Sequence, residues 1–187
     1  MRCCECALIY VPSIFHLDAT AERAEYDLHE NHIDDPGYRK FLSRLVVPLQ
    51  ESIPPAARGL DYGCGPGPAL VQMLLENGHC MACYDPFYAL DSRVLEDDYD
   101  FITATEVVEH MYHPGDELMR LWEMLVPGGV LGVMTKLALD RAAFSNWHYK
   151  NDPTHVCFFS RETWYWWGNK HNAKVSIRGA DVILLRK

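Results

Sequence analysis

Carboxylate and imidazole side chains are grouped at two places in the second half of the chain. Glu106, Glu109 and His110 are spaced so that one helical turn would place all three on the same face. His155 follows in a segment rich in aromatic residues. Imidazoles and carboxylates serve as general bases, and together they also bind divalent metals such as Mg²⁺, Mn²⁺, Fe²⁺ or Zn²⁺.

Two chemical interpretations of this group stay open. In the first, which we favour, no metal is bound and His110 or His155 acts as a general base beside Glu109. In the second, a divalent metal is held by Glu106, Glu109, His110 and His155. The same spacing is also explained without a metal, by a solvated helical face that carries a single base.

A glycine-rich loop is the second chemical feature. Residues 59–62 predict a buried strand, and residues 69–76 have the apolar spacing of an amphipathic helix. Three alternating glycines lie between them: Gly63, Gly65 and Gly67. They let the backbone turn sharply and leave no Cβ where a ligand must lie close. Because N–H groups at the helix start face such a ligand, the loop predicts a nucleotide-like cofactor.

The spacing of the loop indicates which cofactor. A dinucleotide-binding loop has a third glycine where this chain has Pro68, and here Asp61 stands two residues before the first glycine. The run 60–67, Leu-Asp-Tyr-Gly-Cys-Gly-Pro-Gly, resembles motif I of the class I S-adenosylmethionine (SAM)-dependent methyltransferases. The resemblance implies that Asp61 helps to hold the amino-acid end of SAM and that the loop contacts it through Gly63, Cys64, Gly65 and Gly67.

The order of the following elements fits the same family. A second apolar run at residues 81–84 ends in Asp85 and Pro86, and an acid at that strand end accepts hydrogen bonds from ribose hydroxyls. A strand at 99–103, a helix at 115–125 and a strand at 130–135 follow. Three runs in this part look like the second half of the family: Asp-Phe-Ile, Val-Val-Glu-His and Leu-Val-Pro-Gly-Gly-Val-Leu. The resemblance therefore covers residues 55–137. It adds Thr105 and Glu106 to the expected cofactor contacts.

These elements predict an α/β fold, a doubly wound Rossmann-like methyltransferase domain with a mainly parallel sheet. We expect a reduced third strand, because residues 86–99 leave little room for a helix and a full strand. Residues 174–178 and 181–186 predict an antiparallel hairpin at the C-terminus.

The chain divides into two expected parts. Residues 1–54 form an N-terminal cap segment with helices at 19–31 and 38–52, and residues 55–187 form the SAM-binding core. Within the core, residues 138–160 are an aromatic-rich lid on the acceptor side, or else a hydrophobic plug that completes the core. Four residues of the cap are candidates for the pocket wall or for ordinary packing: Tyr26, His29, Asn31 and Tyr38.

The N-terminus carries one C-x-x-C pair, Cys3 and Cys6. Its surroundings resemble the second half of a small zinc knuckle that precedes some methyltransferase domains. Structural zinc needs four ligands, and the other pair, Cys80 and Cys83, lies in a predicted strand where positions three apart point to opposite faces. We therefore expect a metal-free N-terminus.

Composition limits the possible partners. The chain has 187 residues, 49% of them hydrophobic, which fits one domain with an ordinary core. Its net charge of −9 argues against a nucleic-acid partner, and no apolar run approaches membrane-spanning length. Seven cysteines, an odd number, and no apolar signal segment predict reduced thiols in a cytoplasmic protein.

The resemblance implies an enzyme, a SAM-dependent methyltransferase (EC 2.1.1.-) that acts on a small molecule. The Glu-x-x-Glu-His run is similar to that of the ubiquinone-pathway O-methyltransferases. With the distant His155 it also resembles the small-RNA terminal 2′-O-methyltransferases. We therefore expect O-methylation, with SAM as cofactor and a divalent metal not favoured. The alternatives are a non-catalytic SAM-binding scaffold module and an NAD-dependent oxidoreductase.

Overall fold

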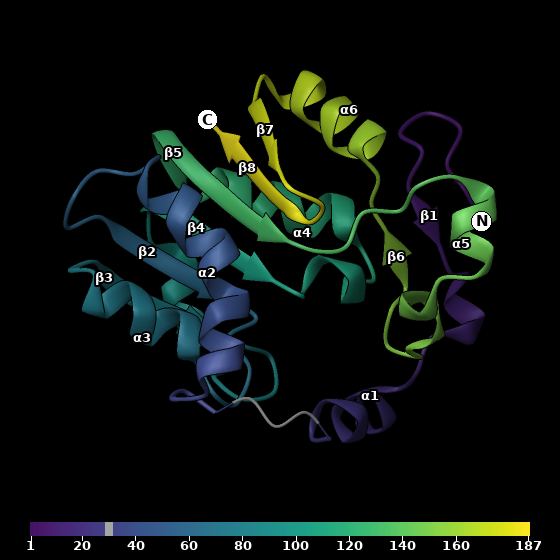
Figure 1. The fold of residues 1–187 in the computed structure, drawn as a ribbon, viewed down its shortest axis with the longest axis horizontal. Coiled ribbons are helices and arrows are strands. Elements are labelled where there is room, and N and C mark those ends of the chain that lie inside the picture. The colour runs from purple at the N-terminus through teal and green to yellow at the C-terminus, as the bar shows by residue number, and fades with distance from the viewer. Residues whose placement is uncertain (29–31) are drawn as a thin grey trace.

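The computed structural model describes residues 1–28 and 32–187, which build around a six-stranded sheet (Figure 1). Its strand order is β3-β2-β4-β5-β8-β7. The first four are parallel, whereas β8 is antiparallel to β5 and β7 to β8. Their bounds are β2 (Arg58–Tyr62), β3 (Cys80–Tyr84), β4 (Tyr99–Thr105), β5 (Leu125–Met134), β7 (Lys174–Arg178) and β8 (Val182–Arg186). The predicted α/β fold with its C-terminal hairpin is confirmed.

The third strand is missing rather than reduced. The chain between β3 and β4 contains one 3₁₀ helix, η2 (Ser92–Glu96), and no strand of the sheet. Directly after β3 the backbone of Asp85 exchanges two hydrogen bonds with Ala89, at 3.0 and 3.1 Å. This tight turn uses residues that a strand would need, so β3 becomes the edge of the sheet.

Helices cover both faces of the sheet. On one face lie α2 (Pro36–Gln50) and α3 (Ala69–Glu76), and the opposite face is covered by α4 (Pro114–Glu123) and α6 (Arg161–His171) (Figure 1). Adjacent residues of β4 point to opposite faces of the sheet. Phe101 packs with residues of α2 and α3, and Ile102 packs with residues of α4 and α6. Alternation along the strand therefore supplies both layers of core.

The strand predicted at 130–135 begins earlier than expected. Helix α4 ends at Glu123, and β5 already starts at Leu125, which pairs with Tyr99. The ladder then has an irregularity before Phe101 pairs with Val130. Gly128 has φ +83°, so the Pro-Gly-Gly sequence bends the strand instead of preceding it.

The N-terminal segment and the aromatic excursion after β5 are joined. Strand β1 (Ile9–Tyr10) pairs antiparallel with β6 (Cys157–Phe158), making a two-stranded sheet beside the main one (Figure 1). Short elements surround it: η1 (Ser13–Phe15), α1 (Ala19–Tyr26), α5 (Arg141–Ser145) and η4 (His148–Asn151). Tyr149 and Phe158 are buried there with Ala138, so the excursion forms a small core of its own.

Part of the predicted first helix lies outside the described residues. Helix α1 covers residues 19–26, and the suggested pocket residues His29 and Asn31 are not described. Within the described parts of the chain, no helix is long and apolar enough to cross a membrane.

Candidate functional site

A large cavity opens at the carboxyl ends of the parallel strands, where open α/β sheets bind their ligands. Its volume is about 830 Å³, within the range of small-molecule sites. The glycine loop, Asp85 and Thr105 line one part, and His110, Tyr149 and His155 line another. Tyr26 and Tyr38, two of the suggested cap residues, also lie in its wall.

The glycine loop is fixed by backbone hydrogen bonds. The N–H groups of Gly63 and Cys64 both donate to the Tyr84 carbonyl, at 2.7 and 3.2 Å. Gly63 and Gly65 have φ +78° and +64°, which favour glycine. A Cβ on Gly63 would lie 2.4 Å from a methyl carbon of Val107, whereas a Cβ on Gly65 would meet only open space. The loop therefore presents bare backbone at Gly65.

Asp85 is held rigidly beside this loop. Its Oδ2 accepts a hydrogen bond from the Gly65 N–H at 3.0 Å. Its Oδ1 accepts from Phe87 and Tyr88 N–H groups at 2.8 and 3.1 Å. The side chain lines the cavity next to Pro86. Oδ2 keeps acceptor capacity, because each carboxylate oxygen has about two lone-pair sites and Oδ2 accepts one hydrogen bond.

Two expected cofactor contacts lie back from the cavity surface. Asp61 is buried beneath the loop, and its Oδ1 accepts a hydrogen bond from Thr103 Oγ1 at 2.7 Å. Burial raises the pKa of Asp61 to about 7, although this hydrogen bond opposes the change. Gly67 is not among the described residues that line the cavity, whereas Gly63, Cys64 and Gly65 are.

The charged group is brought together, but not by one helical turn. Glu106 precedes the 3₁₀ helix η3 (Val108–His110) and has φ +52°, a left-handed conformation that is uncommon for glutamate. Its N–H donates to the Met134 carbonyl at 2.7 Å, which ties it to the end of β5. The prediction of a shared helical face is therefore wrong for Glu106. Glu109 and His110 lie on η3 itself.

His155 packs against His110. Their ring centroids are 4.7 Å apart. His155 Nδ1 lies 2.6 Å from the Tyr149 carbonyl, and His110 Nδ1 lies 3.1 Å from the Thr154 carbonyl. A carbonyl only accepts, so Nδ1 carries the proton in both rings. Burial, together with the neighbouring His110, lowers the pKa of His155 to about 4, so its ring is neutral at pH 7 and Nε2 keeps its lone pair.

Tyr149 connects the carboxylates with the imidazoles. Its hydroxyl donates to Glu109 Oε1 and lies 3.4 Å from Glu106 Oε2. Burial raises the pKa of Glu106 to about 8, and the nearby Glu109 adds to this. Burial likewise raises the pKa of Glu109 to about 7, opposed by the Tyr149 hydrogen bond. The sequence marked Tyr149 only as an aromatic residue of the excursion, because its hydroxyl partners are distant in the chain.

A metal-ligand geometry exists within this group. One ligand atom each from Glu109, His110 and His155 lies within 4.8 Å of the others. Glu106 is outside this set, and its Oε2 lies 3.4 Å from the Tyr149 hydroxyl that binds Glu109. Glu109 Oε2 is buried and has no hydrogen-bond partner among the described residues. One carboxylate and two imidazoles match the donor preferences of Zn²⁺ or Fe²⁺.

Two polar atoms at the cavity lack partners in the described part of the chain: Thr105 Oγ1 and Glu106 Oε1. Buried polar atoms are normally satisfied, and a ligand in the cavity would reach these two only after a shift of their side chains. The bare backbone at Gly65 and the fixed carboxylate of Asp85 lie in the same cavity. These residues fit a cofactor with a sugar and an amino-acid end, as SAM has.

Helix α1 closes the cavity from the far side. The Glu22 carboxylate accepts hydrogen bonds from the hydroxyls of Tyr26 at 2.7 Å and Tyr112 at 3.0 Å. The Tyr88 hydroxyl donates to Asp27 at 2.6 Å, so α1 also contacts the loop after β3. Glu22 gave no signal in the sequence, since it lies in a polar helix whose packing depends on distant residues.

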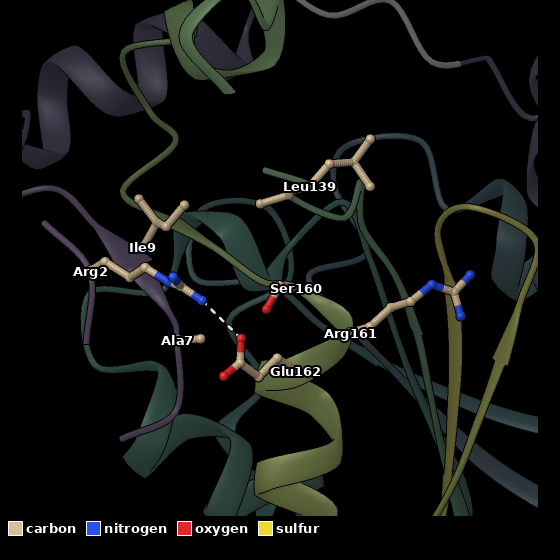
Figure 2. Close-up of a pocket in the computed structure, with 8 residues that line it drawn as sticks. Arg2, Ala7, Ile9, Leu139, Ser160, Arg161 and Glu162 are labelled. Atoms are coloured by element: carbon tan, nitrogen blue, oxygen red, sulfur yellow. Dashed lines mark hydrogen bonds and ion pairs between the residues drawn. The ribbon is translucent and has the colours of Figure 1, made fainter. Parts of the chain in front are cut away.

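A second cavity, of about 170 Å³, lies between the N-terminal segment and the start of α6 (Figure 2). Arg2 and Glu162 point toward each other across it and form an ion pair of 2.8 Å. Arg161 points away, toward the β7–β8 hairpin, where it donates to the Gly179 carbonyl. Both arginines have partners, so this cavity holds no chemistry comparable to that of the large one.

Comparisons with known proteins bear on the family and the fold of the chain. A family model described as a methyltransferase domain matches residues 31–176. The comparison with curated protein sequences gives no significant match.

Among solved structures, the fold is similar to a SAM-dependent methyltransferase from Archaeoglobus fulgidus, with TM-score 0.61 and 15% identity over 80% of this chain and 94% of that one. It is also similar to the 1,6-didemethyltoxoflavin-N1-methyltransferase of Burkholderia thailandensis, solved with bound 1,6-didemethyltoxoflavin and S-adenosylhomocysteine. There the TM-score is 0.58, with 17% identity over 96% and 94% of the two chains. An O-methyltransferase family protein from the same organism has TM-score 0.55 and 16% identity, over 94% of this chain and 61% of that one.

The family match covers most of the chain, and the fold is similar to those of solved methyltransferases. The glycine loop and the fixed Asp85 line the cavity at the carboxyl ends of the parallel strands, where open α/β sheets bind their ligands. The chain therefore belongs to the methyltransferase-domain family, the class I SAM-dependent methyltransferases.

Proposed function

We propose that this enzyme transfers a methyl group from SAM to a hydroxyl oxygen of a small molecule. The observation that carries the proposal is the His110–His155 pair at the cavity wall, because a hydroxyl acceptor must lose a proton as it attacks. Methyl transfer to a nitrogen acceptor does not always need such a base. The enzymes with similar folds include an N-methyltransferase and an O-methyltransferase family protein, so both atoms occur on this scaffold.

SAM would lie along the glycine loop. Gly63, Cys64 and Gly65 offer backbone against which a ligand packs closely, and Asp85 with Pro86 would face the ribose. Thr105 and Glu106 line the cavity beside it. Asp61 and Gly67 would support the loop from behind, since Asp61 is buried under it. When bound, SAM supplies a methyl group that its sulfonium already activates.

His155 is the residue that would take the acceptor's proton. The Tyr149 carbonyl holds the proton on Nδ1, so Nε2 is the basic nitrogen. Asp152 Oδ2 lies 3.8 Å from Nε2 and would stabilise the imidazolium that forms. His110 packs against the same ring, and Glu109 is fixed behind it by Tyr149. Alignment of the acceptor supplies the rest of the rate enhancement.

The excursion 138–160 would cover the acceptor side of the cavity. It contributes His148, Tyr149, Asp152 and His155 to the wall, while Phe158 anchors it in a small core. On this view the N-terminal segment, residues 1–54, acts as a cap on the core of residues 55–187, held to the excursion by the β1–β6 pair.

A metal enzyme is the second candidate function. It is favoured by one observation, the three ligand atoms of Glu109, His110 and His155 within 4.8 Å. A bound divalent ion would act as a Lewis acid that lowers the pKa of the acceptor hydroxyl. Glu106 would then be a more distant carboxylate of the site.

One experiment separates the candidates. The purified enzyme is incubated with [methyl-³H]SAM and a pool of small molecules, with and without a chelator. We expect labelled product in both cases and loss of labelling in His155→Ala. Activity that the chelator abolishes and a divalent ion restores would establish the metal version. Labelled product that resists demethylation conditions specific to methyl ethers would contradict the oxygen acceptor.

A further inference from the structure

Glu22 is a buried carboxylate without a cationic partner. Its residue is 9% exposed and lines the large cavity. Its two oxygens accept hydrogen bonds from the neutral hydroxyls of Tyr26 and Tyr112. Throughout residues 1–28 and 32–187 it forms no ion pair with lysine, arginine or histidine. A buried charge without a counter-ion is costly, and proteins normally pair it.

Two other buried carboxylates have explicit compensation, whereas Asp61 and Glu109, which accept from hydroxyls as Glu22 does, do not line the cavity. Asp181 pairs with Arg44 at 2.7 Å. Asp85 accepts three backbone N–H groups at the loop. Glu22 has neither arrangement, and it faces a space large enough for a ligand. Its missing cation is therefore most simply supplied by whatever enters the cavity.

The surroundings of Glu22 favour a cation. The described residues that line the cavity include five carboxylates and neither lysine nor arginine: Glu22, Asp85, Glu106, Glu117 and Asp152. Aromatic rings stand beside Glu22, with His16 stacked on Tyr112 at 4.7 Å and Phe87 against Tyr26 at 5.7 Å. Aromatic faces together with a carboxylate bind ammonium groups well. An anionic acceptor would be repelled by the same wall.

Tyr26 connects Glu22 with the imidazole pair. Its hydroxyl donates to Glu22, and its ring lies edge-on to His110 with centroids 5.3 Å apart. The carboxylate is thus about one tyrosine side chain away from His110, the ring that packs against the proposed base His155. A small molecule that reaches both would have its charged group at α1 and its reacting group at η3.

We infer that the methyl acceptor carries a protonated amine, which Glu22 binds together with the rings of Tyr26 and Tyr112. The inference rests on the proposed function, since it places the amine in the same cavity as the reacting hydroxyl. It adds the charge class of the substrate, a cationic amine without phosphate or carboxylate groups, and it gives α1 a role in specificity.

The test uses three probes that differ only in their charged group: 2-phenylethylamine, 2-phenylethanol and phenylacetate. Each is titrated by calorimetry into the enzyme saturated with S-adenosylhomocysteine. We expect the amine to bind at least tenfold more tightly than the alcohol, and phenylacetate most weakly. In Glu22→Gln, which removes the charge and keeps an oxygen acceptor for one of the two tyrosines, the preference for the amine should disappear. Glu25→Gln, on the same helix but outside the cavity wall, should keep it.

Three outcomes would overturn the inference. The first is equal affinity for amine and alcohol in the wild type, or no binding of the amine. The second is an unchanged preference in Glu22→Gln. The third is a Glu22→Gln enzyme that loses affinity for SAM but not for S-adenosylhomocysteine, since the cation facing Glu22 would then be the sulfonium of the cofactor.

The same experiment keeps the two proposals apart. Failure of S-adenosylhomocysteine to bind the wild type contradicts the proposed function itself. Normal binding of S-adenosylhomocysteine without an amine preference contradicts only the inference about Glu22. Should Glu22→Gln fail to fold, Tyr112→Leu removes one ring and leaves the carboxylate, and the amine preference should then fall by several-fold.

Discussion

The imidazole rings of His110 and His155 lie with their centroids 4.7 Å apart, although they come from opposite sides of β5 in the sequence. The backbone N–H of Val156 donates to the Glu109 carbonyl at 2.8 Å, which fixes the excursion onto η3. Each ring also donates from Nδ1 to a carbonyl of the excursion. The pair is therefore positioned by backbone contacts between η3 and the excursion.

Replacing Tyr149 should destabilise the protein through its hydroxyl. Tyr149→Phe leaves the ring and the carbonyl but removes the donor to the buried Glu109 carboxylate. Hydrogen bonds to charged groups contribute about 1.5–3 kcal/mol, so we expect a loss of that order in urea unfolding. Tyr165→Phe is the control, because Tyr165 is exposed on α6. Equal midpoints for the two variants would show that the hydroxyl carries no such contact.

Asp61 should make stability depend on pH. Its folded pKa, raised to about 7 by burial, exceeds the usual value of 3.8, so the folded state binds the proton more tightly. The free energy of unfolding should therefore fall as pH rises from 3.8 to 7 and then level off. Each unit of pKa difference corresponds to about 1.4 kcal/mol.

Asp61→Asn removes this titration while keeping an acceptor for Thr103. Denaturant unfolding at pH 5 and pH 8 should show a smaller decrease for the variant than for the wild type. The same decrease in both proteins would mean that other groups, such as Glu106 and Glu109, account for the whole slope.

The N-terminal cysteines give a prediction about metal content. Cys3 and Cys6 form one pair, and structural zinc requires four ligands. Elemental analysis of the purified monomer should therefore find no stoichiometric zinc. One zinc per chain that disappears in Cys6→Ser would contradict this, and it would point to a site shared between two chains.

Local patterns predicted most of the fold. Helix α3 spans the predicted residues 69–76, because apolar spacing after a glycine loop is enough to define it. The hairpin at β7 and β8 follows from two apolar runs around Gly179 in the same way. The sequence predicts a reduced third strand but not its complete loss. The Asp85–Ala89 turn that replaces it depends on backbone hydrogen bonds that composition does not reveal.

The sequence identifies several residues of the candidate site, but it does not predict most of the contacts between them. The metal interpretation of the sequence requires His155 to lie near His110, and the two rings are in contact. Glu106 was expected on the same turn, but its φ of +52° is imposed by its bond to β5. Tyr149 and Glu22 owe their surroundings to packing between segments far apart in the chain, and no local spacing marks such residues.

The central claim is that the glycine loop and Asp85 bind SAM, and calorimetric titration of the enzyme with SAM tests it most directly. The wild type should bind one SAM per chain. Asp85→Ala should bind at least about tenfold more weakly, as expected for lost hydrogen bonds to a charged acceptor. Gly65→Val should not bind, because φ +64° disfavours a branched residue and its side chain would occupy the open space at the loop. SAM affinity that is unchanged in both variants, or absent from the wild type, would contradict the account.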